Sequence, residues 1–465
     1  VMDEIKVKRD SRMVNIGDVF YDLSKDYERG LQHAKEAIAR GAEKVVTVRN
    51  YPLENLEIVS DVREKFGEAC AKEYGYPAKA LKLIGITGTN GKTTCTHIIY
   101  ELLKRSNIKV ARIGTMGVHY DDVDKDYDMT TPDADILQRE FYEMKKREIE
   151  YVVMEVSAHA ISQKRIEGLK FDIGVLTNIT QDHLDYFGNM ENYAKTKLSF
   201  FDSKYIKSAV VNIDDKYALS LFKEEKVPTI FYGVKNPADV FAVNTKSITN
   251  GSEFYCNIFD EVYDIKTKLF GDYNVMNVLA SLSVCASVGL DIHKVSEELR
   301  NIEPVEGRFN VINIGGKSII IDFAHTPDGL DKVLMTAKSL SPKHLYCVFG
   351  CGGNRDVDKR HKMGRIAEKY CDYVCLTDDN PREEDEMKII SDIEAGMTKP
   401  HFVETDRAKA IKKVFGCMQS GDIMVIAGKG AEKYQIIGTE KLDYSDFDVA
   451  RGLLKKDKAK EEYGN

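Results

Sequence analysis

Strand-like and helix-like patterns alternate along most of this chain of 465 residues, and the alternation narrows the folds open to it. Runs rich in β-branched residues, such as 81–87, 151–157 and 172–178, are separated by amphipathic stretches such as 133–147. Strands that alternate with helices form βαβ units, in which a parallel sheet is buried on both faces. The pattern therefore predicts an α/β protein.

The alternation falls into three blocks, and a chain of 465 residues is long enough for about three domains. The predicted domains are residues 1–82, 83–303 and 304–465. The first block predicts a helix over 26–42, a strand over 44–49 and a second helix over 55–74. In the second block, Asn250-Gly251 favours a tight hairpin between two strands.

The composition excludes several classes of protein. Lys and Arg number 67 against 75 Asp and Glu, and 43% of residues are hydrophobic, which argues against a disordered or nucleic-acid-coating chain. No apolar run approaches the roughly 18 residues of a membrane span. Residues 1–10 are charged and lack the apolar core of an export signal, and the nine cysteines lack CxxC spacing. We expect a cytoplasmic chain with reduced thiols and no zinc site.

A glycine-rich loop follows the predicted strand 83–87 and leads into a helical stretch. The loop reads Gly88-Thr89-Asn90-Gly91-Lys92-Thr93-Thr94. Such a loop presents backbone N–H groups and the positive end of a helix to an anion. Lys92 is expected to reach the outer phosphates of ATP, and the Thr93 hydroxyl to bind Mg²⁺. The strict GxxxxGK[ST] pattern is absent because Ile86 stands at its first position, so the alternative is a plain glycine turn.

The stretch from Gly85 to Thr94, together with motifs far downstream, resembles the Mur ligases, ATP-dependent enzymes that build the peptide of bacterial cell-wall precursors. The resemblance covers nearly the whole chain. It is closest to the members that add the third residue to UDP-N-acetylmuramoyl-L-alanyl-D-glutamate. It implies an N-terminal uridine-nucleotide domain, a central domain with a P-loop ATPase-like parallel sheet, and a C-terminal Rossmann-like domain.

The resemblance also assigns the catalytic centre. Glu155 lies at the carboxyl end of one predicted strand and His183 follows the next, at the edge where open parallel sheets place their sites. By resemblance both bind Mg²⁺ with Thr93, and Lys197 is a carbamylated lysine that faces a second Mg²⁺. From the sequence alone, His183 is an ordinary surface histidine and Lys197 a solvated helix charge, so their catalytic roles beside Lys92 rest on the resemblance.

Contacts to three ligands are implied in the same way. Those to ATP are Gly88, Thr89, Asn90, Gly91, Lys92, Thr93, Thr94, Asn274, Asn277, Arg308 and Asp322. Those to the UDP-linked acceptor are Ser11, Thr130, Thr131, Ser157, Gln163 and Arg165. Those to the incoming amino acid are Arg355, Asp379, Asn380, Pro381, Arg382, Gly428 and Glu432. Taken alone, Thr130-Thr131-Pro132-Asp133 is also a helix start, and Asn380-Pro381 is also a plain turn.

The stretch Asp379-Asn380-Pro381-Arg382 bears on which amino acid is added. By resemblance it is the signature of ligases that add meso-diaminopimelate. This diacid carries an amino-carboxylate head that lysine lacks, and Arg382 can bind a carboxylate through two parallel hydrogen bonds. Lysine would leave Arg382 unpaired, at a cost of roughly 3–5 kcal/mol. The sulfur-bridged analogue lanthionine has a similar span, so the sequence leaves it open.

Two features depart from the family pattern. Ala431 replaces a usual histidine, and residues 21–26 lack the usual glycine- and histidine-containing stretch. The favoured function is transfer of a phosphoryl group from ATP to the D-glutamyl side chain of the UDP-muramoyl dipeptide, followed by amide formation with the diamino diacid. The rivals are the same ligase using L-lysine or lanthionine, a folylpolyglutamate-synthetase-like ligase, and a non-catalytic nucleotide-binding homologue. We expect a monomer with no nucleic-acid or membrane partner.

Overall fold

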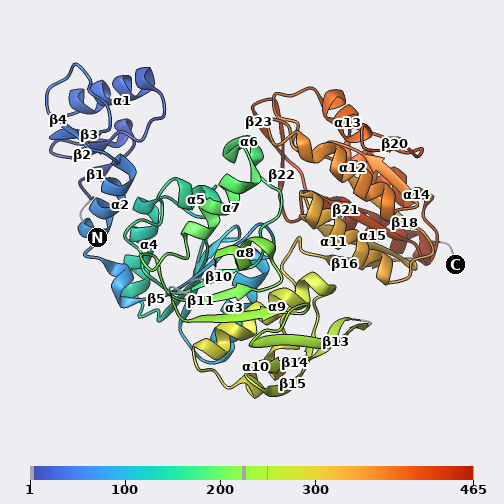
Figure 1. The fold of residues 1–465 in the computed structure, drawn as a ribbon. Coiled ribbons are helices and arrows are strands. Elements are labelled where there is room, and N and C mark those ends of the chain that lie inside the picture. The colour runs from blue at the N-terminus through green and yellow to red at the C-terminus, as the bar shows by residue number, and fades with distance from the viewer. Residues whose placement is uncertain (1–4, 222–226, 249, 464–465) are drawn as a thin grey trace.

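The computed structural model describes residues 5–221, 227–248 and 250–463, which form three lobes (Figure 1). The blue lobe holds a four-stranded sheet, the cyan-to-yellow lobe an eleven-stranded sheet, and the orange-to-red lobe a six-stranded sheet. The first and third lobes both border the middle one and lie apart from each other. The predicted α/β class is confirmed, while the domain boundaries near 82 and 303 stay predictions.

The first lobe is a small parallel sheet in the order β1-β2-β3-β4. Its elements are β1 (Val7–Lys8), β2 (Val19–Tyr21), α1 (Tyr27–Ala39), β3 (Lys44–Thr47), β4 (Leu56–Ile58) and α2 (Val62–Glu73). The helix predicted over 55–74 is wrong in its first part, because β4 pairs with β3 there. The helix begins only after Asp61, whose carboxylate accepts hydrogen bonds from the N–H groups of Arg63 and Glu64.

The middle lobe is built on the large sheet, in the order β15-β14-β13-β12-β11-β10-β5-β9-β6-β7-β8. Its strands are β5 (Lys82–Thr87), β6 (Val110–Gly114), β7 (Gly117–Tyr120), β8 (Val123–Lys125), β9 (Tyr151–Glu155), β10 (Phe171–Leu176), β11 (Ile206–Asn212), β12 (Thr229–Gly233), β13 (Val240–Ile248), β14 (Gly251–Ile258) and β15 (Glu261–Thr267). Its helices are α3 (Lys92–Arg105), α4 (Ala134–Lys146), α5 (Ala158–Ser162), α6 (Leu184–Phe187), α7 (Met190–Ser199), α8 (Lys216–Leu221), α9 (Asp272–Ser287) and α10 (Ile292–Leu299). The antiparallel pairing of β13 with β14 confirms the predicted hairpin.

This sheet is buried on both faces, as predicted. Successive side chains of a strand point to opposite faces, and on β9 Val153 packs in one core while Val152 and Met154 pack in the other. The first core includes residues of α3, α9 and α10, and the second includes residues of α4 and α7. Such two-sided burial leaves the carboxyl edge of the parallel strands as the place for a site.

The third lobe has a sheet in the order β16-β17-β21-β18-β19-β20, parallel except for β16. Its strands are β16 (Asn310–Ile314), β17 (Lys317–Asp322), β18 (Leu345–Phe349), β19 (Tyr373–Leu376), β20 (Phe402–Val403) and β21 (Ile423–Ala427), with a separate hairpin of β22 (Tyr434–Ile437) and β23 (Glu440–Asp443). Its helices are α11 (Pro327–Ser339), α12 (Asp358–Tyr370), α13 (Glu386–Glu394), α14 (Arg407–Cys417) and α15 (Asp446–Tyr463). Over the described ranges, no helix combines the length and apolar character needed to cross a membrane.

Candidate active site

The glycine-rich loop connects β5 to α3 at the centre of the large sheet. Gly88 has φ +147° and Gly91 has φ +89°, a region that L side chains rarely adopt. A Cβ on Gly88 would collide with the Thr177 hydroxyl, and one on Gly91 with the side-chain oxygen of Asn277. No side chain caps the first turn of α3, within the described residues. Its N–H groups are therefore available to an anion, as predicted for a phosphate loop.

Two lysines converge on this loop. Lys92 Nζ donates hydrogen bonds to the carbonyl oxygens of Gly88 and Thr89, each at 2.9 Å. Lys197 Nζ, from α7, donates to the same Gly88 oxygen at 2.8 Å, and its side chain is buried. Removal from water lowers the pKa of both amines, and the Lys92 cation lowers that of Lys197 further. Lys92 is thereby placed to bind a polyphosphate, and the Lys197 amine lies beside it at the same carbonyl oxygen.

Glu155 ends β9, next to the loop. Thr93 Oγ1 donates to Glu155 Oε2 at 3.1 Å, and the Thr115 N–H donates to Glu155 Oε1 at 2.9 Å. A hydroxyl and a carboxylate oxygen of this kind fit Mg²⁺, which prefers oxygen ligands. In the part of the chain that the structure describes, no three His, Cys, Asp or Glu side chains group as a metal site. The residues therefore fit an ion that takes its remaining ligands from phosphate and water.

His183 lies at the start of α6, with φ +54°. Its Nε2 is 3.2 Å from Asp182 Oδ2, and its ring centroid is 4.7 Å from that of His159. Burial lowers the pKa of His183 to about 3, so its imidazole is neutral and able to bind a metal ion. His183 forms no hydrogen bond with Thr93 or Glu155 among the described residues, so the structure does not join the three predicted Mg²⁺ ligands directly.

A cavity of 420 Å³ lies between the middle and third lobes, beside the loop. Its lining includes the predicted nucleotide contacts Asn90, Gly91, Thr93, Thr94, Asn274, Asn277, Arg308 and Asp322. Asn277 Nδ2 donates to Asn274 Oδ1 at 3.0 Å, and Asn90 Nδ2 reaches across the lobes to Asp328 Oδ2 at 2.9 Å. The remaining predicted contacts, Gly88, Thr89 and Lys92, belong to the same loop. This cavity is the candidate nucleotide site.

Five predicted acceptor contacts gather near Glu155. Thr131 Oγ1 donates to the Glu155 carbonyl oxygen at 2.8 Å and accepts from the Ser157 N–H at 3.1 Å. Arg165 donates to the Thr131 carbonyl oxygen and to Gln163 Oε1, both at 2.8 Å. The Thr130 hydroxyl is 3.3 Å from that of Thr115, which also contacts Glu155. These residues form a connected acceptor cluster.

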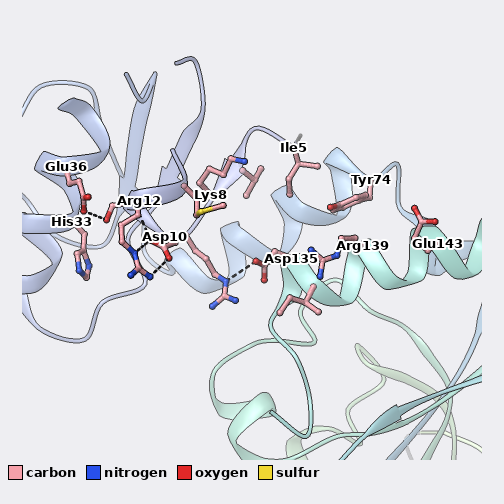
Figure 2. Close-up of a pocket in the computed structure, with 15 residues that line it drawn as sticks. Ile5, Lys8, Asp10, Arg12, His33, Glu36, Tyr74, Asp135, Arg139 and Glu143 are labelled. Carbon is pink, nitrogen blue, oxygen red and sulfur yellow. Dashed lines mark hydrogen bonds and ion pairs between the residues drawn. The ribbon is translucent and has the colours of Figure 1, made fainter. Parts of the chain in front are cut away.

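The sixth acceptor contact, Ser11, lies apart from that cluster. It lines a cavity of 1040 Å³ between the first lobe and α4, and its hydroxyl donates to Glu36 Oε2 at 2.6 Å. Figure 2 shows Arg12, His33 and Glu36 on one side of this cavity and Arg139 of α4 on the other. Its mixed charges and hydroxyl suit a polar ligand.

Asp133 links the two acceptor regions. Its Oδ2 accepts from Arg9 Nη1 at 2.7 Å, and its Oδ1 is 3.3 Å from Arg165 Nε. Arg9 lines the large cavity, whereas Arg165 belongs to the acceptor cluster. One carboxylate thus couples the first lobe to the cluster near Glu155.

The predicted amino-acid contacts lie on the third lobe, after the carboxyl ends of β18, β19 and β21. Arg382, with φ +56°, donates to the carbonyl oxygens of Gly353 and Asn380 at 3.0 and 3.3 Å. Glu432 Oε2 accepts from Asn380 Nδ2 at 3.3 Å. Burial lowers the pKa of Arg382, and the nearby Arg355 cation lowers it further. The other predicted members are Asp379, Pro381 and Gly428, and a Cβ on Gly428 would collide with the Asp379 carboxylate.

Arginine side chains and carboxylates thus lie close together on these loops. This arrangement suits a ligand with both amino and carboxylate groups. Sequence reasoning gave no role to Arg9, Asp182 or Lys429, which the structure places within these sites. Asp182 is the neighbour of His183 in the sequence, and Lys429 lies between two glycines in a family motif. The sequence therefore held a signal for each of these two residues.

Comparisons with known proteins bear on both sites. Residues 86–285 match the family described as Mur ligase middle domain, and residues 307–430 match Mur ligase, glutamate ligase domain. The chain is 38% identical to the UDP-N-acetylmuramoyl-L-alanyl-D-glutamate–2,6-diaminopimelate ligase of Geobacillus kaustophilus, over 98% of this chain and 95% of that protein.

Similar solved structures include members of the same family. A UDP-N-acetylmuramoyl-L-alanyl-D-glutamate–2,6-diaminopimelate ligase structure matches with a TM-score of 0.70 and 32% identity, over 97% of this chain and 94% of that one. A folylpolyglutamate synthase of Mycobacterium tuberculosis, solved with ADP and AMPPCP, matches with a TM-score of 0.65 at 18% identity. That match covers 78% of this chain and 92% of the other, and shows a shared fold alone.

Proposed function

Because this chain belongs to the Mur ligase family of ATP-dependent amide ligases, we propose that it joins meso-2,6-diaminopimelate to UDP-N-acetylmuramoyl-L-alanyl-D-glutamate. The observation that carries the proposal is a pair of residue clusters, one on each of the two lobes that together line the nucleotide cavity. A phosphate loop with two amines lies on the middle lobe, and an Arg382–Glu432 cluster lies at the carboxyl edge of the third. The full-length relatives support the substrates.

The first step activates a carboxylate, which is a poor electrophile. An oxygen of the D-glutamyl side chain attacks the γ-phosphorus of ATP, so that an acyl phosphate forms and ADP leaves. Lys92 and the N-terminal N–H groups of α3 bind the moving phosphoryl group, and catalysis here is mainly positioning and charge compensation. Thr93, Glu155 and His183 would hold Mg²⁺, which neutralises phosphate charge when bound.

The acceptor is held by the middle and first lobes. Arg165 and Gln163 bind its anionic and peptide groups, with the hydroxyls of Thr130, Thr131 and Ser157. The cavity at Ser11 takes the uridine end, and the Arg9–Asp133 pair keeps that cavity in a fixed relation to the cluster.

The second step forms the amide. The amine of the diamino diacid attacks the acyl carbon, the tetrahedral intermediate expels phosphate, and one proton leaves the nitrogen. Arg382, with Arg355, binds the distal carboxylate, while Glu432 and Asp379 attract the distal ammonium. Closure of the middle and third lobes, which both line the nucleotide cavity, would exclude water that hydrolyses the acyl phosphate.

Phosphate release from ATP tests this function. The UDP-muramoyl dipeptide is supplied with diaminopimelate, lanthionine, lysine or no amine, and diaminopimelate is expected to give the highest kcat/KM. Fast release with lysine or lanthionine would reassign the amino acid within the same reaction. Release that requires a folate acceptor would support the rival ligase, and nucleotide binding without turnover would support a non-catalytic homologue.

Lys197 is proposed to be carbamylated. Its amine is buried beside Lys92, and carbamylation would convert it into an anion next to that cation. In ¹³C-bicarbonate, the unaltered protein is expected to show a carbamate resonance in its ¹³C NMR spectrum, and CO₂-free buffer to lower activity severalfold and reversibly. Lys197→Arg should lose the resonance, whereas Lys195→Arg, an exposed position on the same helix, should keep it. A resonance that survives in Lys197→Arg contradicts the assignment.

We place the reaction in the cytoplasm, which supplies ATP, and the nine free cysteines agree with a reducing compartment. A single chain supplies the phosphate loop, the acceptor cluster and the amino-acid cluster, so we propose that it acts as a monomer.

A further inference from the structure

Lys429 is a fully buried lysine at the candidate amino-acid site. It is the second residue after β21, between Gly428 and Gly430, and its side chain has no exposed surface. Lysine is almost never fully buried without a partner. Here Nζ donates to Asn380 Oδ1 at 2.8 Å and to Glu432 Oε2 at 3.1 Å, and it lies 4.0 Å from Asp379 Oδ1.

We propose that Lys429 is a positioning residue that fixes Asn380 and Glu432 for recognition of the incoming amino acid. The inference rests on the proposed function and deepens it. Lys429 has no exposed surface from which to touch the substrate, so it acts through the two residues that it contacts.

The Asn380 amide shows how this positioning works. Its Oδ1 accepts hydrogen bonds from two donors, Lys429 Nζ and the Ile436 N–H of β22, the latter at 2.9 Å. Rotating the amide by half a turn would set its NH₂ group against both donors. Nδ2 is therefore directed towards Glu432 and can serve a substrate carboxylate beside Arg382.

The charge of Lys429 has a second effect. Asp379 and Glu432 are carboxylates on neighbouring loops, and an ammonium between them offsets their mutual repulsion. Lys429 and Asn380 both donate to Glu432 Oε2, whereas, among the described residues, the hydrogen bond to Oε1 comes from the Tyr434 hydroxyl alone, at 3.4 Å. Glu432 Oε1 is thus the atom left to accept a substrate ammonium.

Substituting the lysine tests the proposal. Lys429→Met is expected to raise the KM for diaminopimelate about 10–100-fold, because Asn380 and Glu432 lose a buried hydrogen-bond donor. ADP binding, measured by calorimetry, should stay unchanged. Lys429→Gln keeps a donor and should show a smaller rise. Lys433→Met, exposed and four residues further on, should match the unaltered enzyme.

A double-mutant cycle separates positioning from general stabilisation. If Lys429 acts partly through Asn380, adding Lys429→Met to Asn380→Ala should raise the KM by a smaller factor than Lys429→Met does alone, because coupled residues are non-additive. Fully additive effects, or equal losses in ADP binding and amino-acid KM, would overturn the proposal. If Lys429→Met fails to fold, a crystal structure of the unaltered enzyme provides the test. Contact between Lys429 and Asn380 in that structure would support the inference. A Lys429 side chain directed away from Asn380 would refute it. Absence of diaminopimelate-dependent phosphate release in the unaltered enzyme would instead refute the proposed function.

Discussion

Lys92→Met is expected to lower the rate of ATP-driven ligation by about 10³-fold or more. Lys92 Nζ lies within the phosphate loop, where it donates hydrogen bonds to the carbonyl oxygens of Gly88 and Thr89. Methionine keeps the length of the side chain but removes the cation that compensates charge on the moving phosphoryl group. Single-turnover phosphate release at saturating substrates measures this step.

A control on the same helix makes that result specific. Lys104→Met removes an exposed lysine near the other end of α3, and we expect near-normal turnover and an unchanged midpoint of thermal unfolding. A Lys92→Met enzyme that folds normally and keeps more than about a tenth of its rate would contradict the role assigned to the phosphate loop.

Arg382→Ala is expected to lower kcat/KM for diaminopimelate by about 10²–10⁴-fold, because the distal carboxylate loses its half-buried guanidinium partner. The affinity for ATP should be unaffected, since Arg382 contacts Gly353 and Asn380 and does not line the nucleotide cavity. The preference for diaminopimelate over lysine should shrink in parallel. Amine-dependent phosphate release and nucleotide titration measure the two effects separately.

Arg365→Ala provides the matched control. Arg365 is an exposed arginine on α12 that forms no ion pair with another described residue, so its loss should leave both constants near normal. Equal losses of amino-acid use and ATP affinity in Arg382→Ala would remove Arg382 from the amino-acid site.

Local patterns predicted the strand, turn and helix of the glycine-rich loop well. The β5 run, the glycines at 88 and 91 and the start of α3 are adjacent in the chain, so their signals need no tertiary information. The first part of the helix predicted over 55–74 failed because pairing of β4 with β3 overrides a local helical preference. The role of Lys429 was missed because its partner Asn380 lies 49 positions away in the sequence.

The two departures from the family pattern have structural explanations. Ala431 leaves the Lys429–Glu432 contact intact, so the amino-acid cluster forms without the usual histidine. In the atypical segment 21–26, the buried Asp22 carboxylate accepts a hydrogen bond from the Tyr51 hydroxyl at 2.6 Å, and Ser24 N–H donates to it at 3.0 Å. The segment is thereby held by its own polar network, which the sequence pattern did not reveal.

Oxygen tracing gives the most direct test of the chemistry proposed for this protein. The D-glutamyl side-chain carboxylate of the UDP-linked dipeptide is labelled with ¹⁸O, and the phosphate released during ligation is examined by mass spectrometry. Activation by phosphoryl transfer predicts that each phosphate carries one labelled oxygen, while the other stays in the new amide. Unlabelled phosphate accompanied by normal product formation would contradict the account.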